Sequence, residues 1–228
     1  MLRELLNAWR GRDLLSRMLA DYQAMLEKTE WMFTAVSDVL LRKRRPEEVG
    51  PDIYRTDKEV NECERDIRRE IVSNLISRPN ADVAASLILM SVVKDAERIG
   101  DYCKNIFEVA RSYTMNFDHG RYITPLRETR TRIESLISRT RKAFSAGDEA
   151  EAARIVADAE ALTRWCDERI EELFHDDLPT QKAVAYTLLL RYFKRIASHL
   201  RNIASAVMGT VEELDYPLGP EHGRLKKS

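Results

Sequence analysis

The sequence predicts an all-α protein made of two tandem three-helix bundles, with six long helices in total. Charged residues make up 33% of the 228 residues and hydrophobic residues 44%, with only 8 Gly and 7 Pro, a composition that favours long amphipathic helices over a turn-rich β fold. Apolar residues recur at helical spacing between a few breaks that contain Pro or Gly. A stretch of the third predicted helix returns in the sixth, which indicates an internal duplication.

Three helices are predicted in the first half of the chain, over residues 13–41, 53–76 and 81–113. The cluster from Pro46 to Pro51 is expected to end the first helix, and Pro79 and Asn80 separate the second from the third. The third helix is apolar nearly all round between Val83 and Val93, which is typical of a deeply buried helix.

Three further helices are predicted in the second half, over residues 122–144, 149–174 and 180–214. A turn at Ala146 to Asp148 separates the first two, and Asp148 is the expected N-cap of the helix that follows. Asp176 to Pro179 forms the next turn, and a polar tail with Pro and Gly ends the chain.

The duplication is visible when Glu97 to Ile106 is placed over Lys194 to Ile203, since Arg, Ile, Asn and Ile coincide at four positions. The second and fifth helices align less firmly. We therefore predict a first three-helix repeat over residues 1–115, a second over 116–214 and a polar tail over 215–228.

Two acidic helix faces in the first repeat indicate a metal site. Glu97 and Asp101 are four residues apart, so their carboxylates lie on one face of the third helix and repel each other. Asp57, Asn61 and Glu64 have the same spacing on the second helix, which a short connection makes an antiparallel neighbour. Such an oxygen-only set suits magnesium, manganese, calcium or oxidised iron better than a structural zinc.

An alternative interpretation makes these carboxylates an ordinary solvated helix face, with Lys94 and Lys104 as their ion-pair partners. Gly100 lies between Glu97 and Asp101, and a glycine inside a helix often marks the close approach of another group. Either a metal ion or a neighbouring helix would explain it, so both interpretations remain open.

The string from Lys94 to Ile106 contains Glu-Arg-Ile-Gly-Asp followed by Asn-Ile, and it resembles the signature of the PhoU family. The acidic stretch from Asp57 to Glu64 is similar to that family's second helix, and the resemblance extends over residues 13–208. It implies two three-helix bundles and metal ions, divalent or trivalent, on acidic motifs, with iron, manganese, magnesium, calcium and zinc all open. It also implies a homodimer that restrains phosphate uptake and phosphate-starvation signalling through a phosphate ABC transporter or a sensor kinase.

Composition also indicates which partners and which cellular compartment to expect. Lys and Arg (37) nearly balance Asp and Glu (38), so no general attraction to nucleic acid is expected. The sequence shows no signal peptide and no membrane helix, and three separated cysteines without a paired motif favour a reducing cytoplasm. A non-enzymatic regulator at the cytoplasmic face of a transporter is the leading hypothesis. A metal-dependent helical-bundle enzyme and a metal-free structural interaction module are the alternatives.

The two repeats are not expected to be equivalent. The positions that match Glu97, Asp101 and Asn61 hold Lys194, Ser198 and Arg164, whereas Glu160 and Asp167 replace Asp57 and Glu64. Lys194 and Arg164 are therefore predicted to neutralise Glu160 and Asp167 internally, and only the first repeat is predicted to bind metal.

Overall fold

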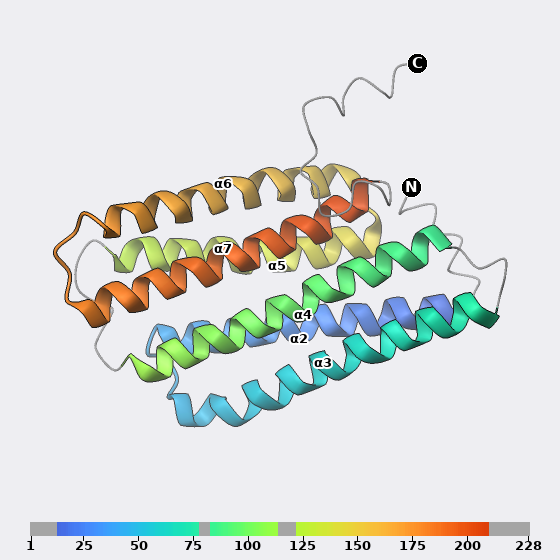
Figure 1. The fold of residues 1–228 in the computed structure, drawn as a ribbon, viewed down its shortest axis with the longest axis horizontal. Helices are drawn as coiled ribbons and strands as arrows, with labels where there is room; N and C mark the ends of the chain where they lie inside the picture. Colours follow the sequence, from blue (N-terminus) through green and yellow to red (C-terminus); the bar gives the residue numbers. More distant parts are fainter. Residues whose placement is uncertain (1–12, 78–82, 114–121, 210–228) are drawn as a thin grey trace, which may run out of the picture.

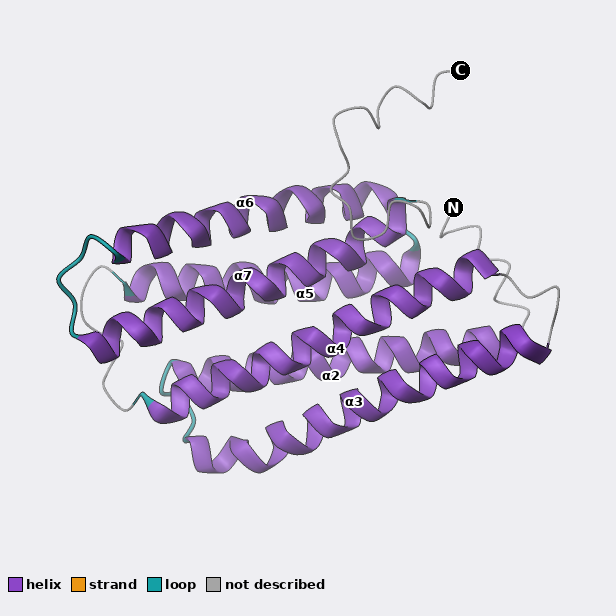
Figure 2. Ribbon diagram, viewed as in Figure 1, coloured by secondary structure: helices purple, strands orange, loops and turns teal. Residues whose placement is uncertain are grey.

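The structure, a computed structural model, describes residues 13–77, 83–113 and 122–209, and these form six long helices (Figure 1). Their bounds are Asp13–Leu40 (α2), Pro46–Ser77 (α3), Val83–Ser112 (α4), Ile123–Ala146 (α5), Glu149–Leu173 (α6) and Thr180–Met208 (α7). No strand occurs within these ranges (Figure 2). The predicted all-α class and the six helices are confirmed.

The helices form two bundles that lie side by side. Helices α2, α3 and α4 pack together as one bundle, and α5, α6 and α7 as the other. Between the bundles, α4 packs on α7 and α2 packs on α5, so α3 and α6 lie on the outer sides (Figure 1). One face of α3 therefore contacts its own bundle while the rest is turned to solvent.

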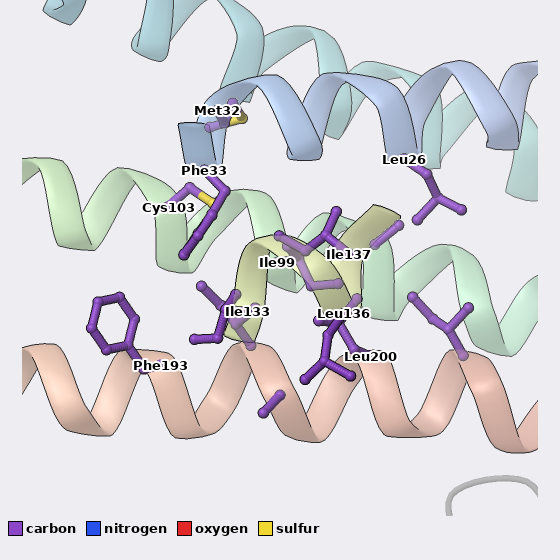
Figure 3. Close-up of a cluster of buried hydrophobic side chains, with 14 of the residues drawn as sticks. Leu26, Met32, Phe33, Ile99, Cys103, Ile133, Leu136, Ile137, Phe193 and Leu200 are labelled. Atoms are coloured by element: carbon purple, nitrogen blue, oxygen red, sulfur yellow. The ribbon is translucent and has the colours of Figure 1, made fainter. Parts of the chain in front are cut away.

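A single hydrophobic core runs through both bundles. Figure 3 shows Phe33 of α2 and Ile99 of α4 in the same cluster as Ile137 of α5 and Leu200 of α7. Aromatic pairs reinforce the junction between the bundles, with ring centroids 4.9 Å apart for Tyr22 and Phe144. Because each half buries its apolar face against the other, we expect the two repeats to unfold together.

The start of the second predicted helix is corrected by the structure. Pro46 to Pro51 does not separate two helices, since α3 begins at Pro46 and includes Pro51. Proline is well tolerated at the first helical position, where its missing N–H would have had no helical partner. Gly50 carries no Cβ to clash with the ring of Pro51, which eases the helical conformation before a proline.

The predicted turn between α5 and α6 is confirmed. Gly147 takes a left-handed conformation, with φ of 61°, and its N–H bonds back to the last turn of α5. The Asp148 side chain accepts a hydrogen bond of 3.0 Å from the Glu151 N–H, as an N-cap does. The predicted end of the last helix at Leu214 lies outside the described residues.

None of the helices in the described ranges combines the length and the hydropathy needed to cross a membrane.

Two glycines that face neighbouring helices are expected to respond in opposite directions to alanine. A Cβ at Gly50 would lie 3.0 Å from Cζ of Phe107, a buried ring that Tyr54 contacts edge-on. A Cβ at Gly100 would lie 3.5 Å from Cγ1 of Val60, which is ordinary contact. Gly50→Ala should therefore lower the free energy of unfolding by about 1–2 kcal/mol through overpacking, whereas Gly100→Ala should raise it by up to about 1 kcal/mol through helix propensity.

Urea denaturation of both variants measures the contrast. Shifts of the same sign would contradict the packing described here. Val60, Met32 and Thr29 leave ordinary van der Waals room for a Cβ at Gly100, so the packing of the neighbouring helices does not require a glycine there.

Candidate metal centre

The predicted site residues lie in two facing rows on α3 and α4. Asp57, Asn61 and Glu64 follow one another along α3, and Glu97 and Asp101 along α4. The helices run antiparallel, so one end of the α3 row meets Lys104 and the other end meets Glu97. Lys104 is bonded to Asp57, and Glu64 contributes its charge to the environment of Glu97. The structure thus brings the two acidic faces together, as predicted.

At one end of the rows, Lys104 joins the two helices. Its Nζ lies 2.8 Å from Oδ2 of Asp57 and 3.1 Å from Oδ1 of Asp101. Burial would lower the pKa of the ammonium, but the hydrogen bonds to both carboxylates outweigh burial and raise the pKa. Lys104 is therefore a charged cross-link between α3 and α4, and the ion-pair partner that the alternative interpretation expected.

At the other end, carboxylates face carboxylates. Glu97 is 13% exposed and lies beside Asp101 and Glu64. Burial raises the pKa of Glu97 to about 7, and the negative charges of Asp101 and Glu64 add to the rise. The half-exposed Arg98 lies 3.4 Å from Oε2 of Glu97 and 3.0 Å from Oδ2 of Asp101. Arg68 lies 3.0 Å from Oε1 of Glu64, so each carboxylate at this end has a cation beside it.

The donor atoms fit a hard cation in their chemistry. Oδ1 of Asp57 and Oδ1 of Asn61 are buried and have no hydrogen-bond partner, which leaves two acceptors in the rows unsatisfied. Every candidate ligand is an oxygen, as magnesium, manganese and calcium prefer. Within the described residues, however, no three acidic, histidine or cysteine side chains converge closely enough to hold an ion as they stand. Metal binding by Glu97, Asp101, Asp57, Asn61 and Glu64 stays a prediction.

Comparisons with known proteins agree with the sequence signature. The family model of the PhoU domain matches residues 22–110, which include all five predicted ligands. This chain carries a PhoU domain. The resemblance to the PhoU family is thereby confirmed.

A curated relative from Pseudomonas aeruginosa, named as a phosphate-specific transport system accessory protein PhoU homolog, is 26% identical over 173 residues, which cover 73% of this chain and 72% of the relative.

Solved PhoU structures share the fold of this PhoU-domain chain. The crystal structure of PhoU from Pseudomonas aeruginosa superposes with a TM-score of 0.77 at 20% identity, covering 86% of this chain and 96% of that one. The phosphate transport system regulatory protein PhoU from Streptococcus pneumoniae gives a TM-score of 0.69 at 18% identity, covering 85% and 94%. Two three-helix bundles are therefore the architecture that these proteins have in common.

The second repeat neutralises its acidic row internally, as predicted for one of its two cations. Nζ of Lys194 on α7 lies 2.6 Å from both carboxylate oxygens of Asp167 on α6. Arg164 is exposed and makes no ion pair with Glu160 within the described residues, so this part of the prediction is not seen. Solvent competes with an ion pair at an exposed arginine, and holding two long side chains together costs entropy. The PhoU-domain match ends before this repeat.

A buried polar cluster joins the PhoU-domain repeat to the second repeat, and sequence reasoning missed it. Asp95 of α4 is 1% exposed, and its Oδ1 lies 2.7 Å from Nδ1 of His199 and 3.2 Å from Nδ2 of Asn202, both on α7. The His199 ring also stacks on Tyr102, with centroids 5.8 Å apart. The available signal was an aspartate between apolar residues at buried helical positions, but nothing in the sequence named its partners.

Proposed function

We propose that this chain is a non-enzymatic regulator of phosphate uptake and phosphate-starvation signalling. It acts in the cytoplasm by contact with a phosphate ABC transporter, a sensor kinase or both. The observation that carries the proposal is the PhoU-domain match over residues 22–110, which contains the signature string in α4 and the acidic row in α3. The name of the curated relative, an accessory protein of a phosphate-specific transport system, supports the same role.

A reporter of phosphate-starvation gene expression tests this function. Deleting the gene in its host should switch the reporter on in phosphate-rich medium, because a negative regulator would be missing. A plasmid copy of the wild-type chain should restore repression. A reporter that stays repressed in the deletion strain would contradict the proposed regulatory function.

We also propose that the facing rows of α3 and α4 bind a metal cation. Glu64, Glu97 and Asp101 would hold it, because carboxylates of α3 and α4 face each other at this end, and the ion would replace their ion pairs with Arg68 and Arg98. Asp57 and Asn61 extend the same set of oxygens toward Lys104. When bound, the ion would supply the positive charge that joins two acidic helices, so it would stabilise the first bundle in proportion to its concentration.

Homodimerisation is part of the same proposal. Apolar side chains spaced one helical turn apart remain exposed at the end of α3 and the start of α4: Val72 at 49%, Ile76 at 79%, Val83 at 52% and Leu87 at 42%. Exposed apolar groups of this kind suit contact with a second copy. Light scattering at tens of micromolar protein should give the mass of a dimer, and a monomer alone would reject this part.

A further inference from the structure

A small pocket lies at the end of the second bundle where α5 begins, α6 ends and α7 begins (Figure 1). Three aromatic side chains form much of its wall: Tyr122 just before α5, Trp165 on α6 and Tyr186 on α7. The ring centroids of Tyr122 and Tyr186 lie 4.8 Å apart. Every lining residue belongs to the second repeat, so the pocket is separate from the facing rows of α3 and α4.

The pocket has room for one six-membered ring. Its volume is about 110 Å³, and an apolar cavity of about 150 Å³ in a protein interior holds benzene. The side chains of Arg169 and Glu172, which are 35% and 50% exposed, form the rim, so a ring can enter from solvent. Aromatic walls favour an aromatic guest, because the rings attract one another in offset and edge-on contacts.

The rim supplies a hydrogen-bond donor that no described residue uses. The guanidinium of Arg169 lies over Trp165, with Cζ 5.7 Å from the ring centroid, and its Nη2 pairs with Glu172. Nε of Arg169 is buried and donates to no acceptor within the described part of the chain. Ligand pockets are mostly apolar with a few placed polar groups. An unused donor in such a pocket indicates a ligand that brings an oxygen acceptor.

The charges at the rim favour a neutral ligand. Glu172 neutralises the guanidinium of Arg169, so an anionic ligand would meet the negative charge of Glu172. A phenol hydroxyl suits both groups, since its oxygen accepts from the Arg169 Nε–H and its proton can be donated to the carboxylate.

We propose that this pocket binds one neutral phenol ring, either of a small phenolic molecule or of a tyrosine side chain on a partner protein. Side chains of α5, α6 and α7 all line the pocket, so an occupied pocket would link the three helices of the second bundle. The inference goes beyond the regulatory function and does not depend on the metal binding proposed above.

Titration of the full chain, followed by ¹H–¹⁵N nuclear magnetic resonance, tests the site. The indole N–H signal of Trp165, assigned with Trp165→Phe, is the reporter. Added p-cresol should shift this signal with a dissociation constant of about 1 mM or tighter. Toluene, which lacks the hydroxyl, should bind about tenfold more weakly. The anion p-toluate should also bind more weakly than p-cresol.

Two variants test the assigned roles. Arg169→Met removes the donor and should bind p-cresol no better than toluene. Leu190→Phe fills the pocket, since Leu190 is a buried lining residue, and should abolish binding. The matched controls are Arg195→Met, which removes an arginine that also lies over a tyrosine ring, and Leu188→Phe at an exposed position of α7. Both controls should bind p-cresol as the wild type does.

N-acetyltyrosinamide distinguishes the two sources of the ring. Binding at least as tight as that of p-cresol identifies a tyrosine side chain, and weaker or no binding identifies a free phenolic molecule. No shift of the Trp165 signal with p-cresol, equal affinity for toluene in the wild type, or unchanged binding in a folded Leu190→Phe chain would each overturn the inference. If circular dichroism shows that Leu190→Phe does not fold, Arg169→Met decides, because its side chain lies at the rim.

Discussion

Replacing His199 with alanine is expected to lower the free energy of unfolding by about 3 kcal/mol or more, because it leaves a buried carboxylate with one hydrogen-bond partner fewer. Asp95 is 1% exposed, and after the substitution only Asn202, at 3.2 Å, would bond its Oδ1. Urea denaturation followed by circular dichroism measures the loss. His175→Ala is the matched control, since His175 is exposed, and it should change stability by less than about 0.5 kcal/mol.

Substituting Asp95, the partner of His199, distinguishes the cost of an unpaired buried charge from the cost of a lost contact. Asp95→Ala removes the carboxylate and leaves only hydrogen-bonding groups without a partner, so its cost should be smaller, about 1–3 kcal/mol. Adding Asp95→Ala to His199→Ala should then restore part of the stability. If the two substitutions were simply additive, the cluster would not act as a unit, and this account of how the repeats are joined would be wrong.

The second large effect concerns metal content. Glu97→Ala and Asp101→Ala should each abolish Mn²⁺ binding, because each removes a ligand from the end of the rows where carboxylates face one another. Bound metal stabilises a protein by about 2.7 kcal/mol when its concentration is one hundred times the dissociation constant. A chelator should therefore lower the melting temperature of the wild type and leave both variants unchanged.

Glu160→Ala is the matched control in the second repeat, where Lys194 already neutralises Asp167 at 2.6 Å. Metal content, measured by elemental analysis, should equal that of the wild type. Metal that survives the loss of both Glu97 and Asp101 but disappears in Glu160→Ala would show that the site lies in the second repeat and would contradict this assignment.

Most of the fold could be predicted from the helical spacing of apolar residues and from the Pro and Gly residues between the helices. The turn at Gly147 and Asp148 was predictable because each residue has a local role, a left-handed conformation and an N-cap. The start of α3 was not predictable from the sequence. Pro46 and Pro51 usually indicate a break between helices, but here they lie in the first turns of the helix. Whether a proline ends a helix or begins one depends on neighbours such as Gly50.

The candidate site was predictable only within each helix. Spacing along α3 and α4 identified the two acidic faces, because residues four apart share a face. The bond from Lys104 to Asp57 depends on how far one helix is shifted along the other, which packing alone decides. The cluster of Asp95, His199 and Asn202 joins the two repeats, and the aligned counterpart of Asp95 is Tyr192, so the duplication gave no hint of it.

The initial rate of radiolabelled phosphate uptake tests the regulatory role most directly. Cells that lack the gene, grown in phosphate-rich medium, should take up phosphate faster than wild-type cells, and a plasmid copy of the chain should return the rate to the wild-type value. The relative named as an accessory protein of a phosphate-specific transport system leads to the same expectation. An uptake rate that is unchanged by deletion and by complementation would contradict the account.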